Sequence, residues 1–173
     1  MALSIRSARP DDWGAVLHVV EAAFGKASTA RFTEELCRLP DFDSELTFVA
    51  EVDAEVVGFT MLSRVAVEGR PERLLTLTPM AVRPDVQRRG IGVALVEAAI
   101  AAADGRGEPL VLVEGVPAYY PRFGFRSATA LGIERPDERI PDDAWMALPL
   151  RAYDPAIRGR IVYPDFFPGP PGA

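Results

Sequence analysis

The sequence predicts a single α/β domain of the α+β kind, with one mixed β-sheet covered by helices on both faces. Three observations support this fold class. Strand-like segments occur as neighbours joined by short turns, helical segments lie between them, and 173 residues suffice for one substantial core but not for two. The composition, 49% hydrophobic and 25% charged, is that of an ordinary soluble protein.

The N-terminal segment is expected to form one strand and two helices. Residues 3–6 alternate as in a strand, and Pro10 can open a helix that Gly25 would end. Ser28 is the expected N-cap of the second helix, which should stop before Pro40. The spacing predicts that the first helix has one apolar face and that His18 lies off this face. The residues of the predicted face are Trp13, Val16, Leu17, Val20 and Phe24.

The rest of the chain is rich in strand signals. The expected strands are residues 46–52, 56–67 after a turn at 53–55, 74–82, the short apolar run 110–113, a strand starting at Phe125, and 145–148 as the last core strand. The expected helices are residues 93–103 and a short one from Pro117 through the two tyrosines.

The most informative segment is Gln87-Arg88-Arg89-Gly90-Ile91-Gly92, between a strand and a helix. Glycines in a first helical turn leave N–H donors and a partial positive charge exposed, which suits a phosphate or pyrophosphate. The two arginines add planar cationic donors. A dinucleotide fingerprint would need glycine or alanine where Leu95 stands, and a P-loop would need a lysine, whereas the chain's one lysine is Lys26.

This loop resembles the coenzyme A pyrophosphate loop of the GNAT superfamily of N-acyltransferases, whose pattern is Gln/Arg-x-x-Gly-x-Gly/Ala. Residues 79–84 are similar to that family's cofactor-binding strand. Residues 119–125, Tyr-Tyr-Pro-Arg-Phe-Gly-Phe, are similar to its tyrosine-x-x-x-Gly-Phe signature and to a bacterial subgroup of predicted acetyltransferases. The resemblance covers roughly residues 3–150.

The resemblance implies a single GNAT-type domain at residues 1–150 with a mixed, mostly antiparallel central sheet. The strands ending at Val82 and Val113 would splay apart to admit the pantetheine arm of acetyl-CoA, the co-substrate. Residues 151–173 would form an extension packed on the domain or at a dimer contact. The implied cofactor-binding residues are Met80, Ala81, Val82, Gln87, Arg88, Arg89, Gly90, Ile91, Gly92 and Val93.

Three residues are the catalytic candidates. A bulge at Pro79 would turn the Met80 N–H toward the thioester carbonyl; the alternative is an ordinary proline at a strand end. Tyr120 matches the family tyrosine that protonates the departing thiolate, and otherwise is a core aromatic. Glu114, at the end of a buried strand, is a candidate general base, with a water chain as the alternative. The subgroup's Gly-Asp pair before the proline is replaced here by Gly115-Val116, which leaves the acceptor chemistry open.

Charge and cysteine content limit the partners. A net charge of −6 and a pI near 4.9 argue against nucleic acid and favour cationic acceptors. Cys37 stands alone, and neither a signal peptide nor a membrane-spanning run is evident, so a cytoplasmic protein without membrane contact is expected. No cluster of side chains has metal-ligand spacing.

The predicted function is acetyl transfer from acetyl-CoA to a small-molecule or peptide amine by direct attack in a ternary complex. One alternative is a non-catalytic acyl-CoA-binding sensor or interaction module, which the changed Gly115-Val116 pair favours. Another is transfer to a hydroxyl group or of a longer acyl chain. The resemblance also allows for a homodimer. The aromatic residues of the tail, Tyr163, Phe166 and Phe167, could meet a second subunit, cover an edge of the core or line the acceptor pocket.

Overall fold

The computed structural model describes residues 2–168. The backbone divides into two compact units, Met1–Ser63 with Thr78–Ala102 and Arg64–Leu77 with Ala103–Ala173. Strands β3 (Glu55–Val67) and β4 (Arg73–Val82) each run from one unit into the other. The strand order is β1-β2-β3-β4-β5-β8-β6, with β9 beside β3 and β7 beside β9.

The sheet is mixed and mostly antiparallel, as predicted. Parallel pairing joins β4 to β5 and β7 to β9, whereas β1–β2, β2–β3, β3–β9, β5–β8 and β6–β8 are antiparallel. Beside its parts of β3 and β4, the first unit contains β1 (Leu3–Ser7), α1 (Trp13–Phe24), α2 (Ala27–Cys37), β2 (Thr47–Val52) and most of α3 (Ile91–Gly105). The second contains β5 (Leu110–Glu114), β6 (Arg126–Ser127), β7 (Ile133–Glu134), β8 (Trp145–Pro149) and β9 (Gly159–Val162).

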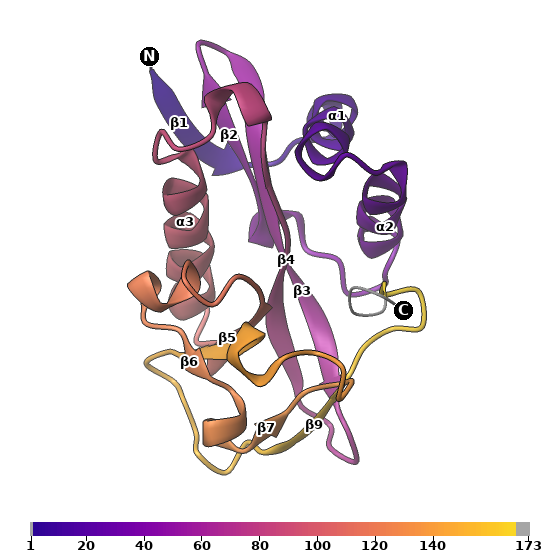
Figure 1. The fold of residues 1–173 in the computed structure, drawn as a ribbon, viewed down its shortest axis with the longest axis vertical. Helices are drawn as coiled ribbons and strands as arrows, with labels where there is room; N and C mark the ends of the chain where they lie inside the picture. The colour runs from indigo at the N-terminus through magenta and orange to yellow at the C-terminus, as the bar shows by residue number, and fades with distance from the viewer. Residues whose placement is uncertain (1, 169–173) are drawn as a thin grey trace. The chain divides into compact units, whose positions relative to one another are not determined.

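Helices cover both faces of the strands in the first unit. A Cβ on Gly58 of β3 would lie 3.0 Å from Leu95 and 3.1 Å from Ile91, so α3 packs closely on this face. The next residue, Phe59, points to the other face because side chains alternate along a strand. Its ring centroid lies 6.0 Å from that of Trp13 in α1. Figure 1 accordingly shows α3 on one side of these strands and α1 and α2 on the other.

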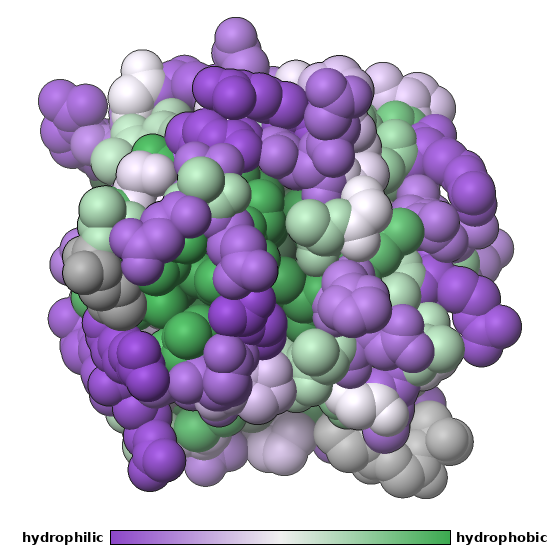
Figure 2. Space-filling model, turned by 90° about the horizontal axis from the view of Figure 1, so that it is seen from above, coloured by the Kyte–Doolittle hydropathy of each residue, from purple (hydrophilic) through white to green (hydrophobic). Residues whose placement is uncertain are grey.

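A tight turn joins β2 to β3. Asp53 and Ala54 both have positive φ values, 51° and 68°. Two left-handed residues are the requirement of the turn type that matches the twist of a two-stranded antiparallel ribbon. Figure 2 looks from above onto the end where Figure 1 shows this turn; hydrophilic side chains dominate the rim of this face, and hydrophobic side chains are exposed near its centre.

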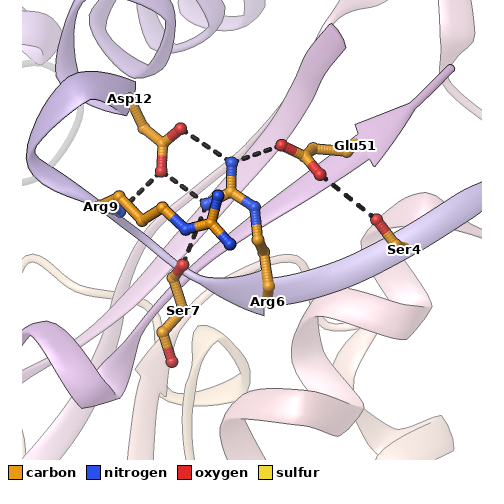
Figure 3. A network of polar contacts seen from close by, with 6 residues as sticks. All are labelled: Ser4, Arg6, Ser7, Arg9, Asp12 and Glu51. Carbon is orange, nitrogen blue, oxygen red and sulfur yellow. Dashed lines mark hydrogen bonds and ion pairs between the residues drawn. The ribbon is translucent and has the colours of Figure 1, made fainter. Parts of the chain in front are cut away.

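A partly buried arginine ties β1 to its neighbours (Figure 3). Arg6 donates two hydrogen bonds to Asp12, at 2.6 and 2.8 Å, and one to Glu51 of β2. Asp12 also accepts from the Arg9 N–H at 2.6 Å. Charge-assisted bidentate contacts of this kind are stronger than neutral hydrogen bonds. Hydrogen bonding to Arg6 therefore holds the pKa of Asp12 below its ordinary value.

The core of the second unit is built around Trp145 of β8. The Trp145 side chain is fully buried, and its Nε1–H donates to the Ile133 carbonyl at 3.0 Å. Partly buried aromatics of the tail, Tyr153, Tyr163 and Phe167, pack against the same cluster of buried residues. The tail thus contributes side chains to the core of its own unit.

Several local predictions were wrong. Helix α2 begins at Ala27 with Lys26 at its N-cap, so Ser28 does not cap it. The buried stripe of α1 includes Val19, which is 3% exposed, and continues through Ala23. Phe24, which was predicted to belong to this stripe, is 46% exposed. The short helix at the tyrosines is a 3₁₀ helix, Tyr120–Phe123, and β9 was not predicted. No helix within residues 2–168 has the length and apolar character needed to cross a membrane.

Candidate functional site

The loop before α3 presents unpaired backbone donors. Arg88 and Gly90 adopt left-handed conformations, with φ of 60° and 85°. The first hydrogen bond of the helix runs from the Ala94 N–H to the Gly90 carbonyl at 3.0 Å. Within the described part of the chain, the N–H groups of residues 88–93 have no acceptor. Such a cluster of backbone donors at a helix start forms a concave anion site.

The arginines around this loop differ in their freedom. Arg83 is held by Asp85, at 2.7 and 3.0 Å, and by Glu55 at 3.1 Å, so its charge is already compensated. Arg88 is exposed and has no ion pair or hydrogen bond to residues 2–168. Arg89 is also exposed and makes one weak contact, at 3.4 Å, to the Asp85 carbonyl. Arg88 and Arg89 are therefore the guanidinium groups available to a ligand.

Strand β4 and Gln87 form the approach to the loop. The Gln87 side chain donates to the Val82 carbonyl at 2.9 Å, which fixes the end of β4 relative to the loop. Met80 is half-buried, whereas Ala81 and Val82 are buried. The Pro79 carbonyl accepts from the Thr60 hydroxyl of β3 at 3.3 Å, and the bond between Thr78 and Pro79 is cis. The predicted bulge and oxyanion role of Met80 stay predictions.

Tyr120 lies at the start of the 3₁₀ helix after β5 and is 7% exposed. Its ring contacts those of Tyr119 and Phe125, with centroids 5.1 and 5.5 Å away. A Cβ on Gly115 would lie 2.2 Å from Cε2 and 2.7 Å from Cδ2 of this ring. Only glycine therefore leaves room for Tyr120 here. Burial, and secondarily Tyr119, raises the pKa of Tyr120, so the phenol stays protonated at physiological pH.

Glu114 is the last residue of β5, paired with Trp145 of β8. Its carboxyl group makes no hydrogen bond or ion pair with residues 2–168. Although the residue as a whole is exposed, desolvation of the carboxyl group, with a smaller contribution from Asp137, raises its pKa. A carboxylate with a raised pKa and no cationic partner is suited to accept a proton or to bind a ligand cation.

The predicted residues fall into two groups. Met80, Ala81, Val82 and residues 87–93 belong to the first unit, and Glu114 and Tyr120 belong to the second. That both groups serve one reaction stays a prediction. His18 is exposed, as expected. Burial raises the pKa of Cys37 to about 11, which disfavours its thiolate, and no group of metal-ligating side chains occurs within residues 2–168.

Two features of the site were missed from the sequence. One is the contact between Gly115 and Tyr120; a glycine directly after a buried strand is a signal of close approach that could have indicated it. The other is that Glu114 shares one cavity with the tail aromatics Tyr163 and Phe167, for which the lining of a pocket was one of the alternatives. Its signal was the cluster of apolar and aromatic residues at 161–167 in the tail.

Comparisons with known proteins agree on a family. The model of the acetyltransferase (GNAT) domain matches residues 43–127. The uncharacterized N-acetyltransferase YjhQ of Escherichia coli (strain K12) is 29% identical over 156 residues, covering 87% of this chain and 86% of that protein.

Two solved structures are similar over nearly the whole chain. The GNAT family N-acetyltransferase YhbS from Escherichia coli, in complex with CoA, has a TM-score of 0.84 at 24% identity, covering 95% of this chain and 91% of that one. A GNAT family acetyltransferase from Brucella melitensis, in complex with acetyl-CoA, has a TM-score of 0.77 at 26% identity, covering 96% and 99%. The subgroup signature at residues 119–125 stays a prediction. The family model, the named relative and the shared fold confirm the predicted resemblance, and the chain contains a GNAT acetyltransferase domain.

Proposed function

We propose that this protein transfers the acetyl group of acetyl-CoA to an amine by direct attack in a ternary complex. The observation that carries the proposal is the loop at residues 88–93, whose N–H groups have no acceptor in the described part of the chain. The pyrophosphate of acetyl-CoA has the charge and the oxygen acceptors that such a loop binds. The complex of the similar Brucella melitensis acetyltransferase with acetyl-CoA supports the same ligand.

The donor is bound by the first unit. Arg88, Arg89 and the loop N–H groups would bind the pyrophosphate, and the backbone of residues 80–82 would pair with the pantetheine arm. The Met80 N–H would donate to the thioester carbonyl and stabilise the negative charge that develops on its oxygen during attack. Gln87 would keep β4 and the loop in register through its bond to Val82, 2.9 Å long.

Proton transfers fall to Glu114 and Tyr120. The acceptor reacts as a free amine, so its ammonium form first gives a proton to Glu114 or to water. The new N–C bond forms as the C–S bond breaks, and the thiolate takes a proton from Tyr120. The proton that the attacking nitrogen loses in becoming an amide then returns to the Tyr120 phenolate, directly or through water. Burial raises the pKa of Tyr120, so this phenol is in its protonated form when the thiolate leaves.

A comparison of Tyr120→Phe with Tyr119→Phe tests this role. Both changes remove one hydroxyl from adjacent rings, and Tyr119 is the less buried of the two. We expect Tyr120→Phe to lower kcat roughly 100-fold with little change in the KM for acetyl-CoA, since general acid catalysis contributes about 10²–10⁴-fold. Tyr119→Phe should stay within a few-fold of the parent. Equal kcat values for both variants would remove Tyr120 from the mechanism.

The competing function is a non-catalytic acyl-CoA-binding module. Val116, 63% exposed, stands where the subgroup has an aspartate, and this observation favours the alternative. Calorimetry with acetyl-CoA, followed by mass spectrometry of reactions with a panel of amines, separates the two. Tight binding without an acetylated product on any amine would support the module, and absence of acetyl-CoA binding would exclude both functions.

A further inference from the structure

The second unit contains a cavity of about 280 Å³ beside the end of β5. This volume is near the lower end of small-molecule sites, which span roughly 300–1,000 Å³. Glu114 forms part of its wall, and the rest comes from the loop before β8 and from β9 with the tail. The lining residues are Glu114, Pro136, Asp137, Ile140, Arg160, Ile161, Val162, Tyr163, Pro164, Phe167 and Pro168.

One wall of the cavity is aromatic. The rings of Tyr163 and Phe167 lie 4.4 Å apart at an interplanar angle of 37°, and Tyr163 also contacts Trp145 edge-on at 6.4 Å. Because both tail rings pack against the core cluster, their positions are fixed by the fold of this unit. Burial raises the pKa of Tyr163, so the ring is uncharged at physiological pH. A flat, uncharged surface of this kind favours an apolar or aromatic group.

The charges on the wall leave one carboxylate without a partner. Asp137 is bound by Arg139 at 2.6 Å, and Arg160 lies 3.6 Å from Glu134. Glu114 has no such contact among residues 2–168, and the charge of Asp137 opposes its ionisation. A ligand cation would satisfy Glu114 and remove part of its desolvation cost.

The cavity and Tyr120 flank the end of β5 from opposite faces. Side chains alternate along a strand, so Glu114 shares a face with Leu112, a member of the Trp145 cluster. At the following residue, Gly115, an added Cβ would point to the other face, where it would lie 2.2 Å from the ring of Tyr120. A group bound to Glu114 and the phenol of Tyr120, the proposed proton donor, therefore lie on opposite sides of the backbone at the end of β5.

We propose that this cavity binds the acceptor, and that the acceptor is a small primary amine that carries a flat apolar group. Glu114 binds the ammonium group and then accepts its proton, and Tyr163 with Phe167 contacts the apolar group. This inference rests on the proposed acetyl transfer, because it names the substrate class of that reaction.

Binding measurements with CoA present, and therefore without turnover, test the cavity directly. The probes are 2-phenylethylamine, 3-phenylpropanoate with a similar shape and opposite charge, and propylamine with the same charge and no ring. We expect 2-phenylethylamine to bind at least ten-fold more tightly than either of the others. The inference is overturned if 3-phenylpropanoate binds equally well or if the ring makes no difference.

Three variants locate the binding site. Glu114→Gln should weaken 2-phenylethylamine binding ten-fold or more and leave CoA binding unchanged. Phe167→Leu should weaken it several-fold, whereas Asp165→Asn, an exposed change in the same tail, should have no effect. Unchanged binding in Glu114→Gln would show that the amine binds elsewhere.

The same variants separate this inference from the proposed function. If 2-phenylethylamine binds through Glu114 but is never acetylated, the cavity assignment stands and the proposed transfer fails. If amines are acetylated and Glu114→Gln and Phe167→Leu leave their KM unchanged, the transfer stands and the cavity assignment fails.

Discussion

The contact between Gly115 and Tyr120 makes a strong prediction for Gly115→Ala. The added Cβ would lie 2.2 Å from the Tyr120 ring, and the ring would have to retreat by about 1.2 Å to reach the 3.4 Å of an ordinary contact. Tyr119, Phe123 and Phe125 surround that ring, so it cannot move freely. Overpacking of this kind costs about 1–3 kcal/mol, and a displacement of about 1 Å at a reacting group can cost roughly 100-fold in rate.

The backbone effect of the substitution works in the opposite direction. Gly115 does not have a left-handed φ, so alanine is allowed there and should stabilise by about 0.4–1 kcal/mol through the unfolded state. Gly105→Ala isolates this gain, because a Cβ at position 105 would have no atom within 4 Å and its φ is also ordinary. At Gly115 we expect the steric cost to exceed the backbone gain, so Gly115→Ala should lower the free energy of unfolding. Gly105→Ala should raise it.

Urea unfolding of a double-mutant cycle measures the steric term. The cycle pairs Gly115→Ala with Tyr120→Leu, which removes the ring and with it the clash. The coupling energy should be about 1–3 kcal/mol, and kcat of Gly115→Ala should fall roughly 100-fold with acetyl-CoA binding retained. If Gly115→Ala costs the same with and without the Tyr120 ring, then the ring is not what excludes a side chain from position 115.

Three further predictions address the loop, the arginine network and the pH dependence. Arg88→Gly should raise the urea midpoint, because it relieves a left-handed arginine, which is worth about 1–2 kcal/mol. The same change should weaken acetyl-CoA binding roughly ten-fold. If stability and affinity for acetyl-CoA changed in the same direction, Arg88 would not have the proposed role in binding the ligand. Asp12→Asn should cost about 1.5–3 kcal/mol at pH 7. Because Arg6 lowers the pKa of Asp12 below 3.8, this difference should shrink as the pH falls below that value, which unfolding at pH 7 and about 3 can check. Since the pKa of Glu114 is raised above 4.5, kcat should decline as the pH falls through that raised value, and a Glu114→Gln pH–rate profile with the same acidic decline would exclude Glu114 as the base.

The sequence predicted the loop at residues 87–92 because its determinants are local. Glycines, arginines and the adjacent helix start are visible without knowledge of any distant contact. The left-handed conformation of Arg88 was not predictable from its residue type, because arginine rarely adopts it. Backbone strain at such a position is common at binding sites, where the surrounding structure enforces it.

The remaining misses concern contacts between distant residues. Strand β9 pairs with β3 through Ala66↔Val162 and Val67↔Ile161, a partnership across almost a hundred residues that no local pattern encodes. The buried stripe of α1 depends on where the sheet lies beneath the helix, and this position determines that Val19 is buried and Phe24 is not. The cavity follows from the pairing of β9, because its aromatic wall depends on where β9 places the tail.

The Gly115-Val116 pair, which stands where the subgroup resemblance implies Gly-Asp, has two separate consequences. Position 115 is fixed by sterics, because any side chain would displace the Tyr120 ring. Position 116 is 63% exposed, so its side chain is not needed to hold Tyr120. Loss of the aspartate therefore leaves the proposed proton donor in place, and Glu114 retains a carboxylate at the end of the same strand. A proton donor must be held in one position to act on the thiolate, and the contact with Gly115 restricts the Tyr120 ring in this way. The exchange at position 116 is therefore compatible with the catalytic proposal, and the comparison of Tyr120→Phe with Tyr119→Phe decides whether the restricted ring acts as the acid or only packs in the core.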